Sequence, residues 1–180
     1  SNMDQLRSMF AQIDELGLTL DVLVNNAGVS ESMPFLEVTE EHFERITFVD
    51  WRGVFFCAQF AARRMIEKKI RGVIVNISSN HVEGCWPNST VYAGAKSAVS
   101  KFTKNAAMEL ARTGIRVVAI EPGYTAVERL STEEFELAKR KLPLGRFATS
   151  EEIAHAVLYA ISDQAAYLTG NIIRIDGAAT

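Results

Sequence analysis

The chain has 180 residues and a formal net charge of −3, which suits one domain with a buried core and argues against a nucleic-acid or anionic-membrane partner. Hydrophobic residues at 48% and charged residues at 23% are typical of a soluble globular protein, and no apolar run reaches the ~20 residues of a membrane span. Cys57 and Cys85 lack the spacing of a disulfide framework or metal site, so we expect a cytoplasmic location. Ser1 and Asn2 are interpreted as a tag remnant, which leaves a single domain at 3–180.

The N-terminal segment predicts a helix followed by a buried strand. Residues 4–16 place apolar side chains at helical spacing, and Gly17 follows as a helix C-cap. The short apolar run at 21–24 then enters the turn Asn25-Asn26-Ala27-Gly28, as expected for a buried strand.

The rest of the chain continues this alternation of helices and strands. Thr39 and the two glutamates after it begin a helical pattern that continues, with a bend near Gly53, to about Lys69. The later elements are a strand at 72–78, a helix at 91–112 ending at Gly114, a strand at 115–120, two helices opened by the capping boxes Ser131–Glu134 and Thr149–Glu152, and a strand at 172–175. This order predicts an α/β fold with a parallel sheet of four strands covered by helices on both faces.

Tyr92 and Lys96 form the first candidate site, because residues four apart on a helix share one face. An ammonium beside a phenol favours the phenolate, so we expect Lys96 to lower the pKa of Tyr92 and to make it a general acid or base. The alternative is an ordinary pair on the helix surface.

Strand ends supply the other candidates. Ser79 ends the strand at 72–78, at the carboxyl edge where parallel sheets present reactive groups, and it lies thirteen residues before Tyr92. Its hydroxyl is suited to donating a hydrogen bond to a substrate carbonyl. The turns at 25–28 and at Pro122-Gly123 end two further strands at the same edge.

The chain resembles the single-domain branch of the short-chain dehydrogenase/reductase family. The matching positions are Asn25-Asn26-Ala27-Gly28, Ser79, Tyr92 to Lys96, Pro122-Gly123 and Asp176-Gly177. The resemblance implies a Rossmann-like doubly wound sheet and hydride transfer between a nicotinamide cofactor, NAD or NADP, and a small-molecule alcohol or carbonyl substrate. It also implies a homo-oligomer, formed by the helix that carries Tyr92 and the helix before the strand at 72–78.

The resemblance assigns roles to individual residues. Tyr92 becomes the acid/base, Lys96 also binds the nicotinamide ribose, and Ser79 holds the substrate oxygen. The cofactor-binding positions are those that approach the adenosine-side ribose and those that border the nicotinamide, namely Asn26, Ala27, Gly28, Pro122 and Gly123.

Two positions depart from the family pattern. Asp50 stands where the family usually has an asparagine that anchors a proton-relay water, and its negative charge is expected to raise the pKa of Tyr92. Val127 stands where many members have a threonine that contacts the nicotinamide, a role that Thr125 is expected to take.

The glycine-rich turn that holds the cofactor's pyrophosphate in this family has no counterpart here, since no two glycines are closer than seven positions. We therefore expect a truncated sheet and a chain that is not catalytically competent alone. We also expect the strand at 21–24 to be an unpaired edge that either self-associates or is covered by a rearranged N-terminal segment.

Other functions remain as alternatives. A non-catalytic oligomerising fragment or pseudoenzyme is the second hypothesis. A serine hydrolase is disfavoured because no Gly-x-Ser-x-Gly elbow is present. A metal site at His81, Glu83 and Cys85 is disfavoured relative to residues that line a substrate pocket. The substrate itself is not identified, and the segment 125–147 is expected to form the lid that selects it.

Overall fold

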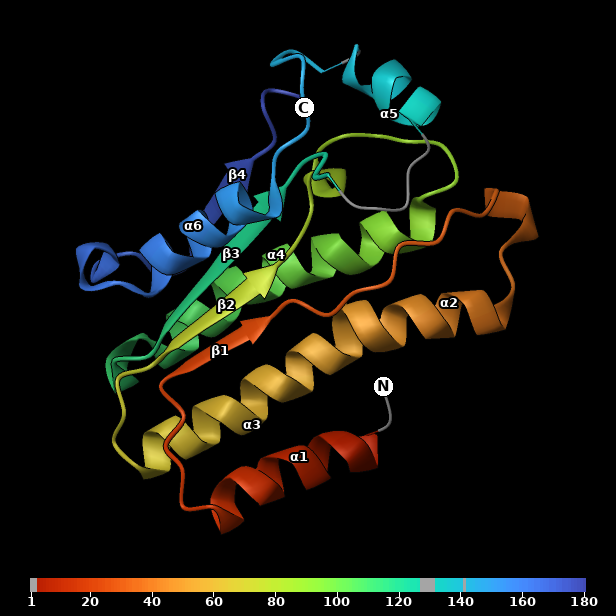
Figure 1. Ribbon diagram of the computed structural model, residues 1–180. Helices are drawn as coiled ribbons and strands as arrows, with labels where there is room; N and C mark the ends of the chain where they lie inside the picture. Colours follow the sequence, from red (N-terminus) through yellow and green to blue (C-terminus); the bar gives the residue numbers. More distant parts are fainter. Residues whose placement is uncertain (1–2, 127–131, 141) are drawn as a thin grey trace.

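The computed structural model describes residues 3–126, 132–140 and 142–180 and contains a four-stranded parallel sheet (Figure 1). The strands lie in the order β1 (Val22–Asn25), β2 (Val73–Ile77), β3 (Arg116–Pro122) and β4 (Ile172–Ile175). Val24 pairs with Val75, and Val75 pairs with Val118, so the first three strands are in register. The turns that follow the strands therefore meet at one edge of the sheet.

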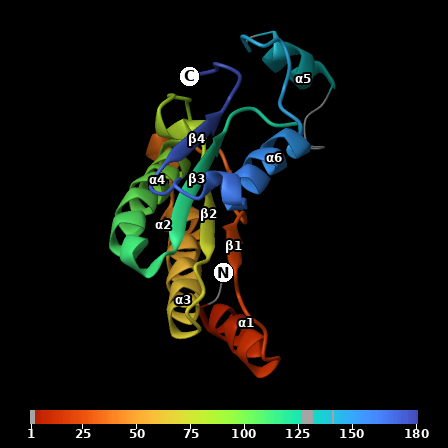
Figure 2. The same ribbon diagram turned by 90° about the vertical axis from the view of Figure 1, so that its left-hand side faces the viewer.

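Helices cover both faces of this sheet (Figures 1 and 2). In chain order they are α1 (Met3–Glu15), α2 (Glu40–Thr47), α3 (Val54–Glu67), α4 (Thr90–Leu110), α5 (Thr132–Lys139) and α6 (Ser150–Ile161). Residues of α1, α3 and α4 pack in one core cluster, and α6 packs in another on the opposite face. The predicted doubly wound, Rossmann-like sheet of four strands is confirmed. Among the described residues, no helix combines the length and apolarity needed to cross a membrane.

The two core clusters follow from the alternation of side chains along the strands. On β3, Val117 faces α3 and α4, whereas Val118 and Ile120 face α6. All three are fully buried, because this strand lies inside the sheet with a helix layer on each side.

Glycines end two helices where they were expected. Gly17 follows α1 with φ +66°, and Gly114 follows α4 and a short 3-10 turn with φ +84°, a left-handed conformation that glycine adopts without strain. The capping box of Thr149 and Glu152 at α6 is also observed. The capping box expected at Ser131 lies outside the described residues, as do the tag remnant Ser1-Asn2 and Val127.

The bend expected near Gly53 is a π-helical turn. It spans Phe48–Gly53 and joins α2 to α3, so the pattern from Thr39 to Lys69 is two helices rather than one bent helix. This turn carries Asp50 and buries it completely. The extra residue in a π-turn rotates a side chain relative to a regular helix, and such turns are frequent at functional sites.

Strand β1 is the edge of the sheet next to α1. Residues 3–15 form the predicted helix α1, which packs alongside α3 through Phe10 and Phe60, whose ring centroids are 5.4 Å apart (Figure 1). No strand among the described residues pairs with the outer edge of β1. The N-terminal segment keeps the predicted helical form and adds no strand to this edge, so its coverage of the edge stays a prediction. Self-association stays a prediction.

Candidate active site

The turns after β1, β2 and β3 enclose a cavity of about 490 Å³ with the N-terminal half of α4. Most of the predicted site residues line it, namely Asn26, Gly28, Ser79, Tyr92, Lys96, Pro122, Gly123 and Thr125. Asp50 lies behind it in contact with Lys96, and Ala27 is exposed and does not line it. Residues from four separate segments therefore converge where the parallel strands end.

Lys96 is held at the floor of this cavity. Its side chain is almost fully buried, and Nζ donates a hydrogen bond to the carbonyl oxygen of Ile77 at 2.9 Å. The same Nζ lies 5.6 Å from the centroid of the Tyr92 ring. This burial excludes an ordinary pair on the helix surface, because a lysine is rarely buried without a partner that requires it there.

That partner is Asp50. Its Oδ1 lies 3.3 Å from Lys96 Nζ, and its two carboxylate oxygens accept from the backbone N–H of Val29 at 3.2 Å each. Burial raises the pKa of Asp50, and the positive charge of Lys96 opposes this shift. Burial likewise lowers the pKa of Lys96, and Asp50 opposes that shift. Each group thus offsets the desolvation of the other.

Gly28 is required by this arrangement. A Cβ atom at this position would lie 2.5 Å from Asp50 Oδ1 and 3.3 Å from Lys96 Nζ. The backbone after β1 therefore passes directly over the ion pair, and any larger residue would separate Asp50 from Lys96.

The expected effect of Lys96 on Tyr92 is wrong. Burial raises the pKa of the Tyr92 phenol, the charge of Asp50 raises it further, and a hydrogen bond with Ser79 opposes the rise. Lys96 is not among the causes of this shift, whereas the rise caused by the charge of Asp50 was expected from the departure at position 50. Tyr92 is therefore a neutral phenol near neutral pH, ready to donate a proton.

The two serines at the end of β2 have different surroundings. Ser78 Oγ donates to the Lys96 carbonyl oxygen at 3.0 Å and lies 2.7 Å from Ser100 Oγ, inside a buried network that continues to Glu121. Ser79 Oγ is next to Tyr92 at the cavity. The geometry favours Ser79 as the substrate-facing hydroxyl and gives Ser78 a structural role.

Aromatic residues form a wall that the spacing of the motifs did not predict. The His81 ring lies 4.3 Å from Trp86 and 5.1 Å from Tyr92, and Trp86 lies 6.3 Å from Tyr124 (centroid distances). Cys85 is exposed, and the described residues contain no group of three or more side chains placed to hold a metal ion. The signal in the sequence was the run of turn-forming residues after Ser79, which marks a loop but not the direction of its rings.

The donors at the cavity fit the nicotinamide-ribose part of a dinucleotide. Lys96 offers an ammonium for hydroxyl groups, and Asn80 Nδ2 is buried without a hydrogen-bond partner among the described residues. Thr125 Oγ1 donates to the carbonyl oxygen of Gly123 at 3.3 Å, which orients its hydroxyl at the mouth. The glycines of the chain are at least seven positions apart, so the sequence contains no counterpart of the glycine-rich turn that holds a pyrophosphate in this family.

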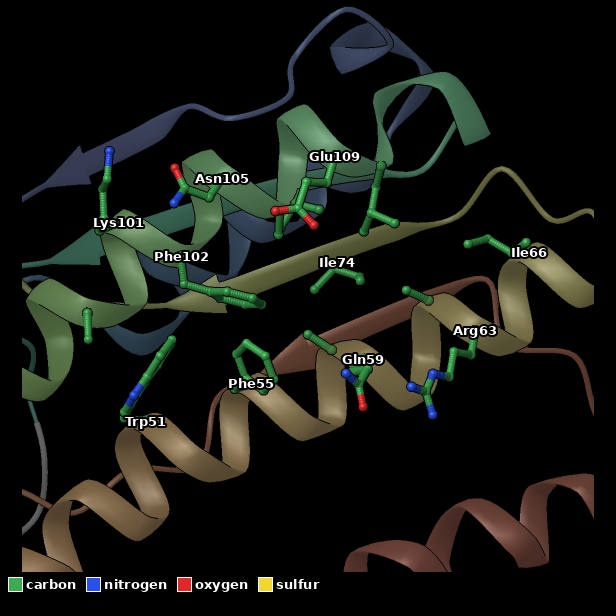
Figure 3. Close-up of a pocket in the computed structure, with 16 residues that line it drawn as sticks. Trp51, Phe55, Gln59, Arg63, Ile66, Ile74, Lys101, Phe102, Asn105 and Glu109 are labelled. Atoms are coloured by element: carbon green, nitrogen blue, oxygen red, sulfur yellow. The ribbon is translucent and has the colours of Figure 1, made fainter.

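A second cavity, of about 590 Å³, lies between α3 and α4, away from these groups. Figure 3 shows Phe55 and Trp51 facing Phe102 across the groove between the two helices, with Ile74 of the sheet at its floor. Charged side chains such as Arg63 and Glu109 stand at the rim (Figure 3). The groove has no cluster of catalytic groups.

Comparisons with known proteins identify the family of the chain. A family model described as enoyl-(acyl carrier protein) reductase matches residues 1–180. The chain is 37% identical to 3-oxoacyl-(acyl-carrier-protein) reductase FabG of Thermotoga maritima, over 98% of the chain and 73% of the relative. It is 39% identical to carbonyl reductase (NADPH) 2 of Sus scrofa, over 87% of the chain and 66% of the relative.

Solved structures show the same likeness. One, a 4-hydroxyisoleucine dehydrogenase complexed with NADH, superposes with a TM-score of 0.95 at 32% identity, covering 99% of this chain and 76% of that one. Another, a short-chain type dehydrogenase/reductase from Mycobacterium marinum, gives a TM-score of 0.92 at 37% identity, covering 99% and 72%. With a family model over its whole length and these relatives, the chain belongs to the short-chain dehydrogenase/reductase family.

Proposed function

We propose that the cavity at the carboxyl ends of β1 to β3 is the site of an NAD(P)-dependent oxidoreductase that interconverts a small-molecule alcohol and its carbonyl compound. The observation that carries the proposal is the convergence of Ser79, Tyr92 and Lys96 on one cavity that also has Pro122 and Gly123 at its border. The nicotinamide, when bound, gives or accepts the hydride.

The residues of the chain move the proton and orient the substrate. In the reducing direction the Tyr92 phenol donates its proton to the carbonyl oxygen while Ser79 donates a hydrogen bond to the same atom. The raised pKa of Tyr92 favours the protonated phenol and hence the reducing direction near neutral pH. Lys96 binds ribose hydroxyls and keeps its place through Ile77 and Asp50.

Cofactor affinity is expected to be weak in these 180 residues by themselves. The donors near Lys96 serve the nicotinamide side, whereas the pyrophosphate needs several adjacent backbone amides, which glycine-rich turns usually provide. We therefore propose that the chain alone turns over slowly or not at all.

A second role, as a homo-oligomer, is favoured by the apolar groove between α3 and α4. Exposed apolar patches of this kind mark interaction sites, and a self-complementary face suits a symmetric dimer. The groove is lined by Phe55, Phe102 and Ala106 and is free of catalytic groups. It supports a non-catalytic, oligomerising function if the chain shows no turnover.

NADH and NADPH oxidation, followed by absorbance at millimolar cofactor with a panel of ketones, tests the proposal. We expect any turnover to disappear in Tyr92→Phe and to persist in the matched control Tyr159→Phe, a half-exposed tyrosine on α6. Turnover that survives in Tyr92→Phe contradicts the acid/base role. The absence of turnover in all three proteins would agree with the weak cofactor affinity expected of these 180 residues by themselves.

A further inference from the structure

His81 lies next to the proposed hydride-transfer site but has no part in the chemistry described above. It belongs to the 3-10 turn Asn80–Val82 that follows β2, and its side chain is half-buried. Nδ1 lies 3.1 Å from Ser79 Oγ, and the backbone N–H of His81 donates to the same Oγ at 3.2 Å. The imidazole is therefore a direct hydrogen-bond partner of the hydroxyl that faces the substrate.

The direction of this hydrogen bond matters because a serine hydroxyl has one hydrogen and two lone pairs. The backbone N–H of His81 occupies one lone pair of Ser79. When Nδ1 carries no hydrogen, it accepts from Ser79 and competes with Tyr92 and with a substrate oxygen for the single hydroxyl hydrogen. When Nδ1 is protonated, it donates to Ser79, and the hydroxyl hydrogen is free to bind the substrate.

Neighbouring rings fix the orientation of the imidazole. Trp86 packs on one side of it with an interplanar angle of 32°, and Tyr92 meets it edge to face at 87°. The two aromatic contacts restrict the tilt of the ring plane. The hydrogen bond at 3.1 Å between Nδ1 and Ser79 Oγ then favours the ring orientation that directs Nδ1 at Oγ, and it can form in either protonation state.

We propose that His81 is a positioning residue whose proton on Nδ1 decides whether Ser79 offers its hydrogen to the substrate oxygen. This inference rests on the proposed function of Ser79 and adds a second titratable group to the site. The site is competent when Nδ1 is protonated, either in the Nδ1–H tautomer or in the imidazolium.

The surroundings of His81 indicate how its protonation, and with it the hydroxyl of Ser79, responds to pH. Burial lowers the pKa of His81 below its ordinary range, so the ring is mainly neutral at neutral pH. Of the charged groups around it, Glu83 on the same loop pairs with Arg174 of β4, and Lys96 of α4 pairs with Asp50. Tyr92 of α4 is the titratable group in contact, and it stays neutral there. Acidification therefore increases the fraction of Ser79 that is free to donate.

Proton-nitrogen correlation NMR of the imidazoles tests the interaction between Ser79 and His81 without cofactor or substrate. The chain has three histidines, and His81→Phe identifies the His81 signals among them. We expect His81 to titrate below the ordinary range of a histidine, because burial lowers its pKa. We also expect Ser79→Ala to lower the pKa of His81 by roughly half a unit or more, since the imidazolium loses its acceptor.

The matched control is Ser30→Ala, which removes another hydroxyl at the same cavity and is expected to leave the His81 titration unchanged. An unchanged pKa and an unchanged tautomer ratio of His81 in a folded Ser79→Ala protein would overturn the proposal. If that variant does not fold, the measurement moves to His81 in the wild-type protein, where an imidazole that never gains a proton at Nδ1 on acidification would overturn the proposal equally.

A kinetic readout separates this inference from the proposed function. In ketone reduction, kcat/KM is expected to rise on acidification through the pKa measured for His81. The variant His81→Phe keeps a ring stacked on Trp86 and is expected to abolish this pH dependence. A dependence that survives in His81→Phe contradicts the positioning role. A third outcome is that Ser79→Ala shifts the His81 pKa as expected while turnover does not depend on Tyr92. This result would contradict the hydride-transfer proposal and leave the Ser79–His81 pair intact.

Discussion

Asp50 is the charged residue that opposes the desolvation of Lys96 and adds to the raised pKa of Tyr92. It is fully buried, and its carboxylate is the immediate counterion of Lys96. A neutral asparagine in its place would leave the lysine charge unmatched beside Tyr92. Burial raises the pKa of the Tyr92 phenol and the aspartate adds to this rise, so the phenol holds its proton more tightly, which suits proton donation better than proton abstraction.

Asp50→Asn is expected to lower the pKa of Tyr92, because it removes a negative charge that raises this pKa. Tyrosinate absorbance during an alkaline titration measures the change, with Tyr92→Phe identifying the contribution of Tyr92 among the four tyrosines. Asp21→Asn, on the exposed surface before β1, is the matched control and should leave the titration unchanged. A pKa that stays constant or rises in Asp50→Asn would show that the charge of Asp50 does not reach the phenol.

The sequence predicts which residues meet at the site but not the sign of the electrostatics. The spacing of Tyr92 and Lys96 on one helix and the position of Ser79 at a strand end suffice to place them together, because parallel strands end at one edge. The pKa of Tyr92 depends on desolvation and on the distance from Lys96 to Asp50, which are properties of the packed structure. The aromatic wall around His81 was missed for the same reason.

Among the elements, α1 is joined to the domain by a small set of contacts centred on Phe10. This side chain is 1% exposed, packs edge to face against Phe60 and lies beneath the guanidinium of Arg64, whose Cζ is 4.9 Å from the ring centroid. Arg64 Nε also donates to Asp14 Oδ1 at 2.9 Å. The helix thus depends on one buried ring and one partly exposed ion pair.

Phe10→Ala is expected to reduce the free energy of unfolding by about 3–5 kcal/mol, the usual cost of removing a buried phenylalanine ring. Urea denaturation followed by circular dichroism measures it. The neighbouring Met9→Ala, at a side chain that is 43% exposed, is expected to change stability by less than about 0.5 kcal/mol. Equal effects from the two substitutions would mean that α1 is not packed as described.

Helices and strands were predicted well where the local sequence signals were strong. The π-turn is an element that these local signals did not predict. Gly17, Gly114 and Thr149 mark helix ends by their own backbone or side-chain chemistry, and the structure places ends there. The segment Phe48–Gly53 has an unbroken helical pattern in sequence, and its π-turn carries Asp50 to Lys96. This contact joins the turn to α4, more than forty residues away in the chain, so a local pattern does not reveal it.

At the scale of the whole molecule, two surfaces are available for self-association. One is the apolar groove between α3 and α4 (Figure 3), and the other is the outer edge of β1, where Val24 is 40% exposed. An apolar edge strand with unpaired amides pairs readily with another strand unless it carries charge. The two modes use different faces and can be separated by mutation.

Phe102→Arg is expected to dissociate an oligomer formed through the groove, and Val24→Lys to prevent association along the edge. The double variant should be a monomer of 19.9 kDa in size-exclusion chromatography with light scattering. Lys104→Glu, on an exposed part of α4 outside the groove, is the control and should keep the wild-type mass. A double variant with the wild-type oligomeric mass would exclude both surfaces.

The most direct test of the proposed site is saturation-transfer NMR with NADH and with reduced nicotinamide mononucleotide, on the wild-type chain and on Lys96→Met. We expect saturation to reach the nicotinamide and adjoining ribose protons of both ligands, with little on the adenine of NADH, and to be lost in Lys96→Met. Transfer mainly to the adenine, or nicotinamide signals unchanged in Lys96→Met, would contradict a nicotinamide site at Tyr92 and Lys96.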